Sequence, residues 1–175
     1  MEDRFFHAKE KSLLEARRKL EHLKETKENL AKVSGIKNDA VLAKLVELNI
    51  RPEILATLFA IPLIEVAWAD GEMHEKEREK LFQYAEKAGM KNRNVDLKVI
   101  SAWLNERPDP GLMEAWTHYI QSLCSQLTEA ERLTLKEEVM TDARDIAHAA
   151  GGFLGFGKLS QEEQAVLSKL EAAFG

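Results

Sequence analysis

Five side chains that can bind a metal ion or transfer a proton lie close together near the middle of the chain. They are Asp70, Glu72, His74, Glu75 and Glu77. Gly71 interrupts the cluster between an apolar stretch and a predicted helix, so a tight helix–turn–helix would present the carboxylates together. Oxygen ligands held in this way are what a hard divalent cation such as Ca²⁺ or Mg²⁺ requires. The sequence therefore contains a candidate cation site at this turn.

The spacing of the cluster is not that of an EF-hand. Gly71 stands at the second position of a loop beginning at Asp70, and Leu81 stands where such a loop needs a bidentate glutamate. A structural role is the alternative, in which Asp70 accepts backbone hydrogen bonds in the turn and Glu77 reaches back to cap the next helix. Acids in the first turn of a helix are also favoured by its dipole. The structural role is favoured, because capping boxes far outnumber metal loops of this shape.

The acidic segment is the first of two similar stretches, opened by Gly71 and by Gly157. Each glycine is followed by a large apolar residue, then an N-cap candidate, then a glutamate three positions later. The corresponding pairs are Met73 and Leu159, His74 and Ser160, and Glu77 and Glu163. This pattern is a capping box with its hydrophobic staple, and it predicts a helix in each copy. The second copy has Phe156 in the place of Asp70, so only Glu163 retains an acid there.

The composition favours a helical, globular chain. The 175 residues are 45% hydrophobic and 31% charged, with a net charge of −5. A chain of this length is expected to form one domain with room for an appendage, and its apolar share can bury a core. Leu and Ala far outnumber Val and Ile, a balance that favours helix over strand. We therefore predict an all-α fold.

Several classes of protein are disfavoured by the same totals. The apolar run from Ile54 to Ala69 contains Pro62 and is shorter than the ~20 residues that a bilayer requires, so no transmembrane segment is predicted. Mild acidity without clustered Lys and Arg argues against nucleic-acid binding. The single cysteine, Cys124, cannot form an internal disulfide, and the chain opens without a signal-peptide pattern. Both features predict a cytoplasmic protein.

Residues 4 to 34 are predicted to form one long amphipathic helix that ends at Gly35. Six of its eight heptad a and d positions are apolar: Phe6, Leu13, Ala16, Leu20, Leu23 and Leu30. Such a stripe suits a coiled-coil dimer, and it also suits a helix that lies across its own domain. The second arrangement is favoured, because it is commoner in globular proteins. We accordingly separate an N-terminal helix, residues 1–35, from a helical domain, residues 36–175.

Helix-start signals divide the helical domain into short-linked elements, about eight helices in all. The signals are Asn38, Pro52, His74, Asp109 with Pro110, Thr128 and Ser160. Residues 53–69 are apolar on nearly every side and should form the buried central helix, in which Pro62 removes one backbone hydrogen bond. A glycine-aromatic loop, residues 151–157, precedes the last helix. Its phenylalanines either fold into the core or form an exposed tip that touches a partner or a membrane.

Two motifs resemble those of TerB-like domains, a family named for a tellurite-resistance protein. The first is I61-P-L-I-E-V-A-W-A-D-G-E-M-H-E-K-E-R78, and the second is A149-A-G-G-F-L-G-F-G-K-L-S-Q-E-E163. The resemblance covers residues 36 to 174 and implies an all-helical bundle of two related hairpins with no established catalytic activity. It also implies that an acidic cluster binds a divalent metal. On this chain the matching residues are Asp70 and Glu77, with Glu72, and Glu163 is the degenerate counterpart in the second half.

The resemblance and the residues together predict a non-enzymatic scaffold or sensor. It would dock protein partners and hold at most one cation, Ca²⁺ or Mg²⁺, weakly at the A-D-G turn. A link to stress or tellurite resistance rests on the resemblance alone. One alternative is a metal-dependent enzyme that uses the same acids. The other is an adaptor, monomeric or homodimeric, that dimerises or contacts a membrane surface through its N-terminal helix.

Overall fold

A computed structural model describes the backbone of residues 2–90, 94–150 and 159–175, and the side chains of residues 11–90, 98–149 and 159–175. The described residues form eight helices and no strand, which confirms the all-α prediction. The helices are α1 (Glu2–Ser34), α2 (Asp39–Glu47), α3 (Pro52–Ala67), α4 (Glu75–Lys87), α5 (Asn94–Asn105), α6 (Pro110–Cys124), α7 (Glu129–Ala150) and α8 (Gln161–Ala173). The glycine-aromatic loop at 151–157 lies outside the described residues.

The predicted capping residues begin the helices as expected. Asn38 Oδ1 accepts hydrogen bonds from the N–H groups of Ala40 and Val41, at 3.0 and 3.3 Å. Asp109 Oδ1 accepts from the N–H of Gly111 at 2.7 Å. These bonds satisfy backbone donors that have no partner inside the helix. Local side-chain chemistry therefore determines where α2 and α6 begin.

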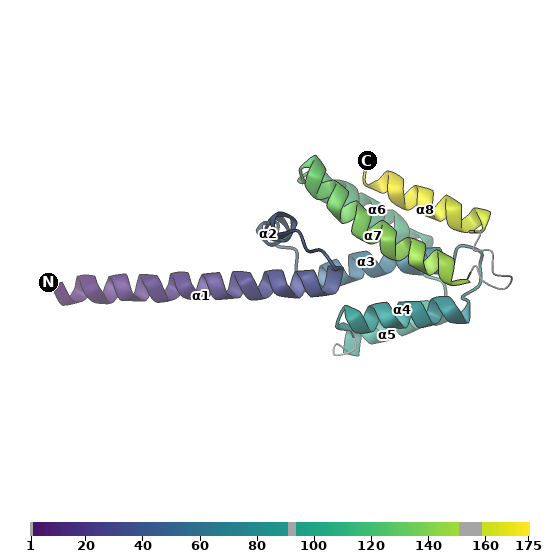
Figure 1. The fold of residues 1–175 in the computed structure, drawn as a ribbon. Helices are drawn as coiled ribbons and strands as arrows, with labels where there is room; N and C mark the ends of the chain where they lie inside the picture. Colours follow the sequence, from purple (N-terminus) through teal and green to yellow (C-terminus); the bar gives the residue numbers. More distant parts are fainter. Residues whose placement is uncertain (1, 91–93, 151–158) are drawn as a thin grey trace.

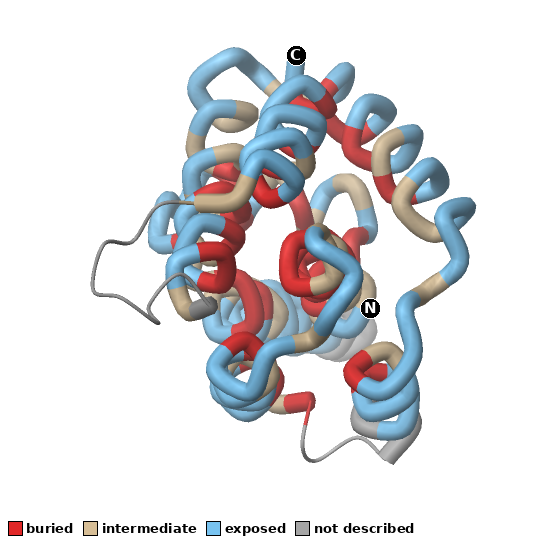
Figure 2. The backbone as a smooth tube through the Cα atoms, turned by 90° about the vertical axis from the view of Figure 1, so that its right-hand side faces the viewer, coloured by how far each residue is buried: buried red, intermediate tan, exposed pale blue. Residues whose placement is uncertain are grey.

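The central helix α3 is buried along most of its length. It packs against α1, α4, α6, α7 and α8, and buried residues surround it in the tube view (Figure 2). The helix continues through Pro62, which has no N–H to donate to the carbonyl of Leu58. The buried indole of Trp116 on α6 supplies the missing donor, with its Nε1 2.6 Å from the Leu58 oxygen. A long-range contact thus compensates for the proline.

The remaining helices flank α3 in two groups. Figure 1 shows α4 and α5 below α3 and α6, α7 and α8 above it, and the two groups meet where α4 packs against α7. Arg78 ties α4 to α5 by donating to the Leu104 carbonyl at 2.8 Å. The indole of Trp68, just after α3, donates to the Trp103 carbonyl, also at 2.8 Å. These contacts fix the turn between α3 and α4 against the body of the domain.

The N-terminal helix does not lie across its own domain over most of its length. Figure 1 shows α1 projecting from the body, and residues 11–25, which we call the arm, are all exposed. Leu13 and Leu20 are 64% and 66% exposed, whereas Leu30 is fully buried. The favoured prediction of an intramolecular stripe is therefore wrong for the arm. It is right only for the last turns of α1, where Leu30 and Val33 enter the core.

Candidate functional site

Asp70 closes a tight turn at the end of α3. Its Oδ1 accepts a hydrogen bond from the N–H of Glu72 at 3.0 Å, and its Oδ2 lies 2.9 Å from Nε2 of His74. Gly71 between them adopts φ +91°, a conformation that side-chain-bearing residues rarely take. The A-D-G sequence is therefore needed for the shape of this turn, and it brings the Asp70 carboxylate over the start of α4.

Glu77 lies in the first turn of α4 and is only 1% exposed. Its Oε2 accepts a hydrogen bond from the backbone N–H of His74 at 3.0 Å. This is the glutamate half of the capping box that the sequence predicts. The side chain is held in place by the helix start, and burial removes it from solvent.

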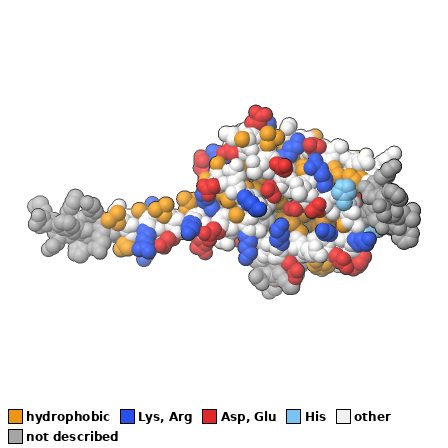
Figure 3. All heavy atoms as spheres, in the orientation of Figure 1, with side chains coloured by type: hydrophobic (Ala, Val, Ile, Leu, Met, Phe, Trp, Pro, Cys, Tyr) orange, Lys and Arg blue, Asp and Glu red, His pale blue; other side chains and the backbone are white. Residues whose placement is uncertain are grey.

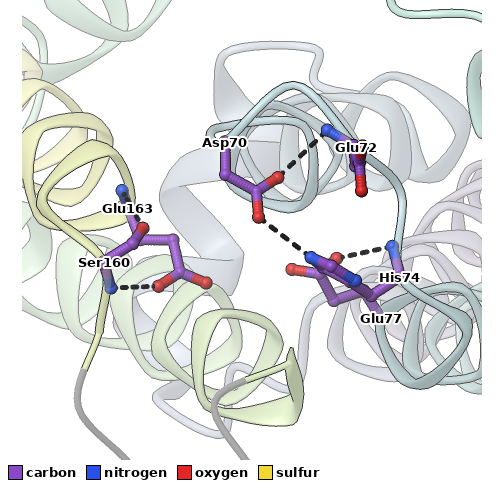
Figure 4. A network of polar contacts seen from close by, with 6 residues as sticks. All are labelled: Asp70, Glu72, His74, Glu77, Ser160 and Glu163. Carbon is purple, nitrogen blue, oxygen red and sulfur yellow. Dashed lines mark hydrogen bonds and ion pairs between the residues drawn. The ribbon is translucent and has the colours of Figure 1, made fainter.

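The second copy of the motif builds the same arrangement at the start of α8. Ser160 Oγ accepts from the N–H of Glu163 at 3.0 Å, and Glu163 Oε2 accepts from the N–H of Ser160 at 2.6 Å. Glu163 is 6% exposed. Figure 4 shows the carboxylates of Asp70, Glu77 and Glu163 directed toward a common space from two elements far apart in sequence.

The acidic groups at this site differ in how readily they bind protons. Burial raises the pKa of Glu77 to about 7, and the negative charges of Asp70 and Glu163 add to this rise. The hydrogen bond from the His74 N–H acts in the opposite direction and lowers the pKa. Burial alone would raise the pKa of Asp70, but hydrogen bonds from His74 and the Glu72 N–H together hold it below its usual value. The hydrogen bond to Asp70 raises the pKa of His74. The site thus contains one carboxyl that is readily neutralised beside one that stays ionised.

The geometry is that of two capped turns rather than a formed metal centre. Among the described residues, no group of three or more His, Cys, Asp or Glu side chains is placed to hold a metal ion. Both oxygens of Asp70 already have partners, as does one oxygen each of Glu77 and Glu163. Glu72 is exposed at the rim of the turn. The carboxylate chemistry suits Ca²⁺ or Mg²⁺, but binding would require these hydrogen bonds to rearrange.

A second candidate site is the arm together with the groove beside it. Helix α2 packs against the C-terminal part of α1, where Lys27 forms an ion pair with Asp39. A groove of about 530 Å³ runs along this contact. Its lining comprises Leu20, Glu21, Leu23, Lys24, Lys27, Glu28 and Ala31 of α1, with Asp39 and Leu42 of α2. The heptad pattern predicted the stripe, but the sequence did not show that α2 covers one end of it and leaves the other bare.

Comparisons with known proteins do not assign the chain to a family. A scan against protein-family models finds no match, and searches of curated proteins and of solved structures find none. Among the helices of the described residues, none combines the length and the apolar character that crossing a bilayer requires. The functional argument therefore rests on the residues and their geometry.

Proposed function

We propose that this protein is a non-enzymatic helical scaffold of the TerB-like type that associates through its N-terminal arm. The observation that carries the proposal is the bare apolar stripe of the arm. Hydrophobic side chains gather along the arm in the space-filling view (Figure 3). The stripe is made by Leu13, Ala16, Leu20 and Leu23.

An isolated helix of the arm's length is marginal in water, because helices in proteins gain most of their stability from packing an apolar face. At Leu13 and Ala16 the arm has this face without a covering element, whereas Leu20 and Leu23 line the groove beside α2. Complete burial of Leu13 and Leu20, which are 64% and 66% exposed, would each contribute about 1 to 2 kcal/mol. A second helix along the stripe would supply that burial and would stabilise the arm.

The proposal of a scaffold, rather than an enzyme, is supported by the hydrogen bonds that the acids make at the helix starts. Both oxygens of Asp70 and one oxygen each of Glu77 and Glu163 take part in the hydrogen bonds of the two capped turns, as expected of structural residues. The rival proposal, a metal-dependent enzyme using these acids, needs an open cleft beside them to admit a substrate. The raised pKa of Glu77 does not distinguish the two proposals, because burial raises the pKa of a structural carboxyl as well as that of a catalytic one. A cytoplasmic location is part of the proposal and rests on the lone, buried Cys124.

Sedimentation velocity of the full chain over a range of concentrations tests association through the arm. The double substitution Leu13→Ser and Leu20→Ser should reduce the assembled mass to that of a monomer. Leu14→Ser is the matched control, because Leu14 is 54% exposed but lies on another side of the helix. If the wild type is a monomer at millimolar concentration, or if the control behaves like the double variant, the proposal fails.

The facing carboxylates favour a second candidate function, the weak binding of one divalent cation. Glu77 and Glu163 are both buried and are directed toward the same space as Asp70 (Figure 4). A cation in this space would offset the repulsion between the carboxylates and would link the start of α4 to the start of α8. The packing of these two helices would then depend on the cation concentration, as in a sensor. A role in stress or tellurite resistance would rest on the TerB-like resemblance alone.

Titration with Ca²⁺ and Mg²⁺ tests this second candidate. Binding should raise the melting temperature and change the fluorescence of Trp68, which lies two residues before Asp70. Glu77→Gln and Glu163→Gln should each remove the effect, whereas the exposed Glu75→Gln should leave it unchanged. Constant melting and fluorescence at millimolar metal would exclude the site.

A further inference from the structure

We propose that the hollow between α1 and the α2–α3 turn, residues 48–51, is a binding site for the phosphate group of a small, partly apolar molecule. Its volume is about 590 Å³, which is within the range of small-molecule sites. The two walls of the hollow come from separate parts of the chain that pack together. The inference goes beyond the proposed function, because phosphate binding here requires neither association through the arm nor a cation at the acidic turn.

One wall of the hollow is a single face of α1. The residues that line it from this helix are Lys19, His22, Leu23 and Thr26. They occupy the i, i+3, i+4 and i+7 positions of the helix, which share one side. The Thr26 hydroxyl already donates a hydrogen bond to the His22 carbonyl at 2.8 Å. The side chains of Lys19 and His22, both exposed, therefore supply the donors of this wall.

The opposite wall is formed mainly by the α2–α3 turn, which backbone hydrogen bonds hold in one conformation. Its lining residues are Val46, Asn49, Ile50 and Arg51. Asn49 adopts φ +57°, and its N–H donates to the Val46 carbonyl at 2.9 Å. The N–H of Ile50 donates to the Leu45 carbonyl, also at 2.9 Å, which completes a Schellman motif. Because a proline follows Arg51, the backbone of Arg51 is restricted to its extended conformation. Its guanidinium group thus extends from a rigid support.

The hollow is basic, although the protein as a whole has a net charge of −5. Lys19, His22 and Arg51 contribute basic groups from both walls, and the lining residues include no carboxylate. Within the described ranges, none of the three forms an ion pair with an acid. Lys27, two turns further along α1, is by contrast paired with Asp39. An anion between the walls would therefore offset a repulsion that these described side chains leave uncompensated.

The donors suit a phosphate better than a carboxylate. A phosphate monoester carries about 1.5 to 2 negative charges at pH 7 and has three strong acceptor oxygens. Lys19 and Arg51 match this charge, and the guanidinium group can donate two parallel hydrogen bonds to a phosphate. His22 and the side-chain amide of Asn49 provide further donors. Helix α3 also begins here without a side-chain cap, so its positive end adds to the attraction.

The rest of the lining indicates that the ligand carries an apolar part. Leu23, Val46 and Ile50 give the hollow an apolar side. Leu23 is 39% exposed, so a ligand that covers it would remove apolar surface from water. An aromatic phosphate should therefore bind more tightly than inorganic phosphate. A soluble organic phosphate and a phospholipid headgroup both present this chemistry.

Calorimetric titration of the full chain with inorganic phosphate and with phenyl phosphate, at constant ionic strength, tests the site. Arg51→Gln and Lys19→Gln should each weaken the binding of phenyl phosphate by about tenfold or more, because each removes a charged hydrogen bond. Arg51→Lys should weaken it less. Arg18→Gln is the matched control, because Arg18 is exposed on α1 but does not line the hollow. It removes the same charge and should change the affinity by less than about twofold. Thermal unfolding without ligand verifies that each variant is folded.

Vesicle co-sedimentation separates the two sources of the phosphate. Vesicles that contain phosphatidic acid, whose headgroup is a phosphate monoester, are compared with phosphatidylglycerol vesicles of equal surface charge. A preference for phosphatidic acid that Arg51→Gln removes would identify a lipid headgroup. Binding of phenyl phosphate without this preference would identify a soluble ligand. Both results support the site.

Two results would overturn the inference. One is the absence of saturable binding of phenyl phosphate together with equal binding to the two kinds of vesicle. The other is an equal loss of affinity in Arg51→Gln, Lys19→Gln and Arg18→Gln, which would show that only the net charge of the protein attracts the anion. Neither result would bear on association through the arm, which sedimentation measures without phosphate.

Discussion

The indole of Trp116 donates a hydrogen bond to the carbonyl of Leu58, the one oxygen in α3 that Pro62 leaves without its helical donor. The 2.6 Å contact joins α6 to the middle of the buried central helix. A buried carbonyl without a partner costs about 1 to 3 kcal/mol. The proline and the tryptophan are therefore energetically coupled, although 54 positions (116 − 62) separate them in the sequence.

Trp116→Phe should destabilise the protein strongly, because it leaves the Leu58 carbonyl unpaired and opens a small cavity. The same substitution should cost about 1 to 2 kcal/mol less in a Pro62→Ala background, where residue 62 regains an N–H for that carbonyl. Urea denaturation of the four proteins gives the coupling. Pro52→Ala is the control background, since Pro52 lies at the first position of α3 and removes no internal bond. Equal costs in all three backgrounds would show that the indole bond does not replace the missing donor.

Glu77→Gln should make the protein less sensitive to alkaline pH. The pKa of Glu77 is about 7 in the folded protein and near its ordinary 4.5 in the unfolded chain, so the folded state binds the proton more tightly. The resulting contribution to stability is complete below about pH 4.5 and is lost as the pH rises through 7. The variant has no such loss, so its free energy of unfolding should gain on the wild type by up to ~3 kcal/mol between pH 4.5 and 8.

Urea titrations at several pH values measure this difference. Glu75→Gln is the matched control, because Glu75 lies in the same turn of α4 but is exposed. Its difference from the wild type should stay nearly constant with pH. A Glu77→Gln profile parallel to that of the wild type would contradict the raised pKa.

Asp70→Asn should lower the pKa of His74. The hydrogen bond to Asp70 is the largest contribution to the raised pKa of His74, and the charge of Glu72 is among the smallest. Glu72→Gln should therefore lower the same pKa much less. An NMR titration of the His74 ring protons follows both variants. Similar shifts in the two would indicate that net charge, rather than the 2.9 Å contact with Asp70, determines the pKa.

Gly71→Ala should destabilise the turn by about 1 to 2 kcal/mol. A β-carbon at Gly71 meets no atom within 4 Å, so the cost arises from the positive φ of +91° alone. Gly71→Asn should cost less, because asparagine tolerates positive φ better than alanine does. Thermal unfolding of both variants tests this order. An equal loss in the two would point to a steric cause instead.

Leu30→Ala and Leu20→Ala should differ sharply in their effect on the monomer, although both leucines lie on α1. Leu30 is fully buried, and its truncation should cost about 2 to 5 kcal/mol. Leu20 is 66% exposed, and its truncation should change the free energy of unfolding by less than about 0.5 kcal/mol. The measurement is made at a concentration low enough to keep the chain monomeric. A large effect at Leu20 would mean that the arm folds back onto the body in solution.

Local signals in the sequence were sufficient to predict the helices. The caps at Asn38 and Asp109 and the glutamate of each capping box act within three residues of the helix start, so they can be read without knowledge of the fold. The buried central helix followed from its apolar composition.

Contacts between distant residues could not be predicted in this way. The sequence identified Glu163 as the counterpart of Glu77, but only the packing of α8 shows that their carboxylates share one space. Glu65 pairs with Arg107 at 2.9 Å, a partner 42 positions away that no local pattern indicates. The position of the arm also depends on where the rest of the chain leaves room, because an amphipathic stripe is the same whether its own domain or another molecule covers it.

Helix α1 passes from solvent into the core without a break, from Leu20 to the buried Leu30. No hinge separates the two parts, so the direction in which the exposed leucines point around the helix axis is fixed relative to that of the buried ones. One residue inserted between them would swing the outer leucines by about 100°, whereas seven would return them almost to their original bearing. The body is thus joined rigidly to any molecule that binds the outer turns of α1. A rotation of those turns would be transmitted to α3, because α1 packs against it.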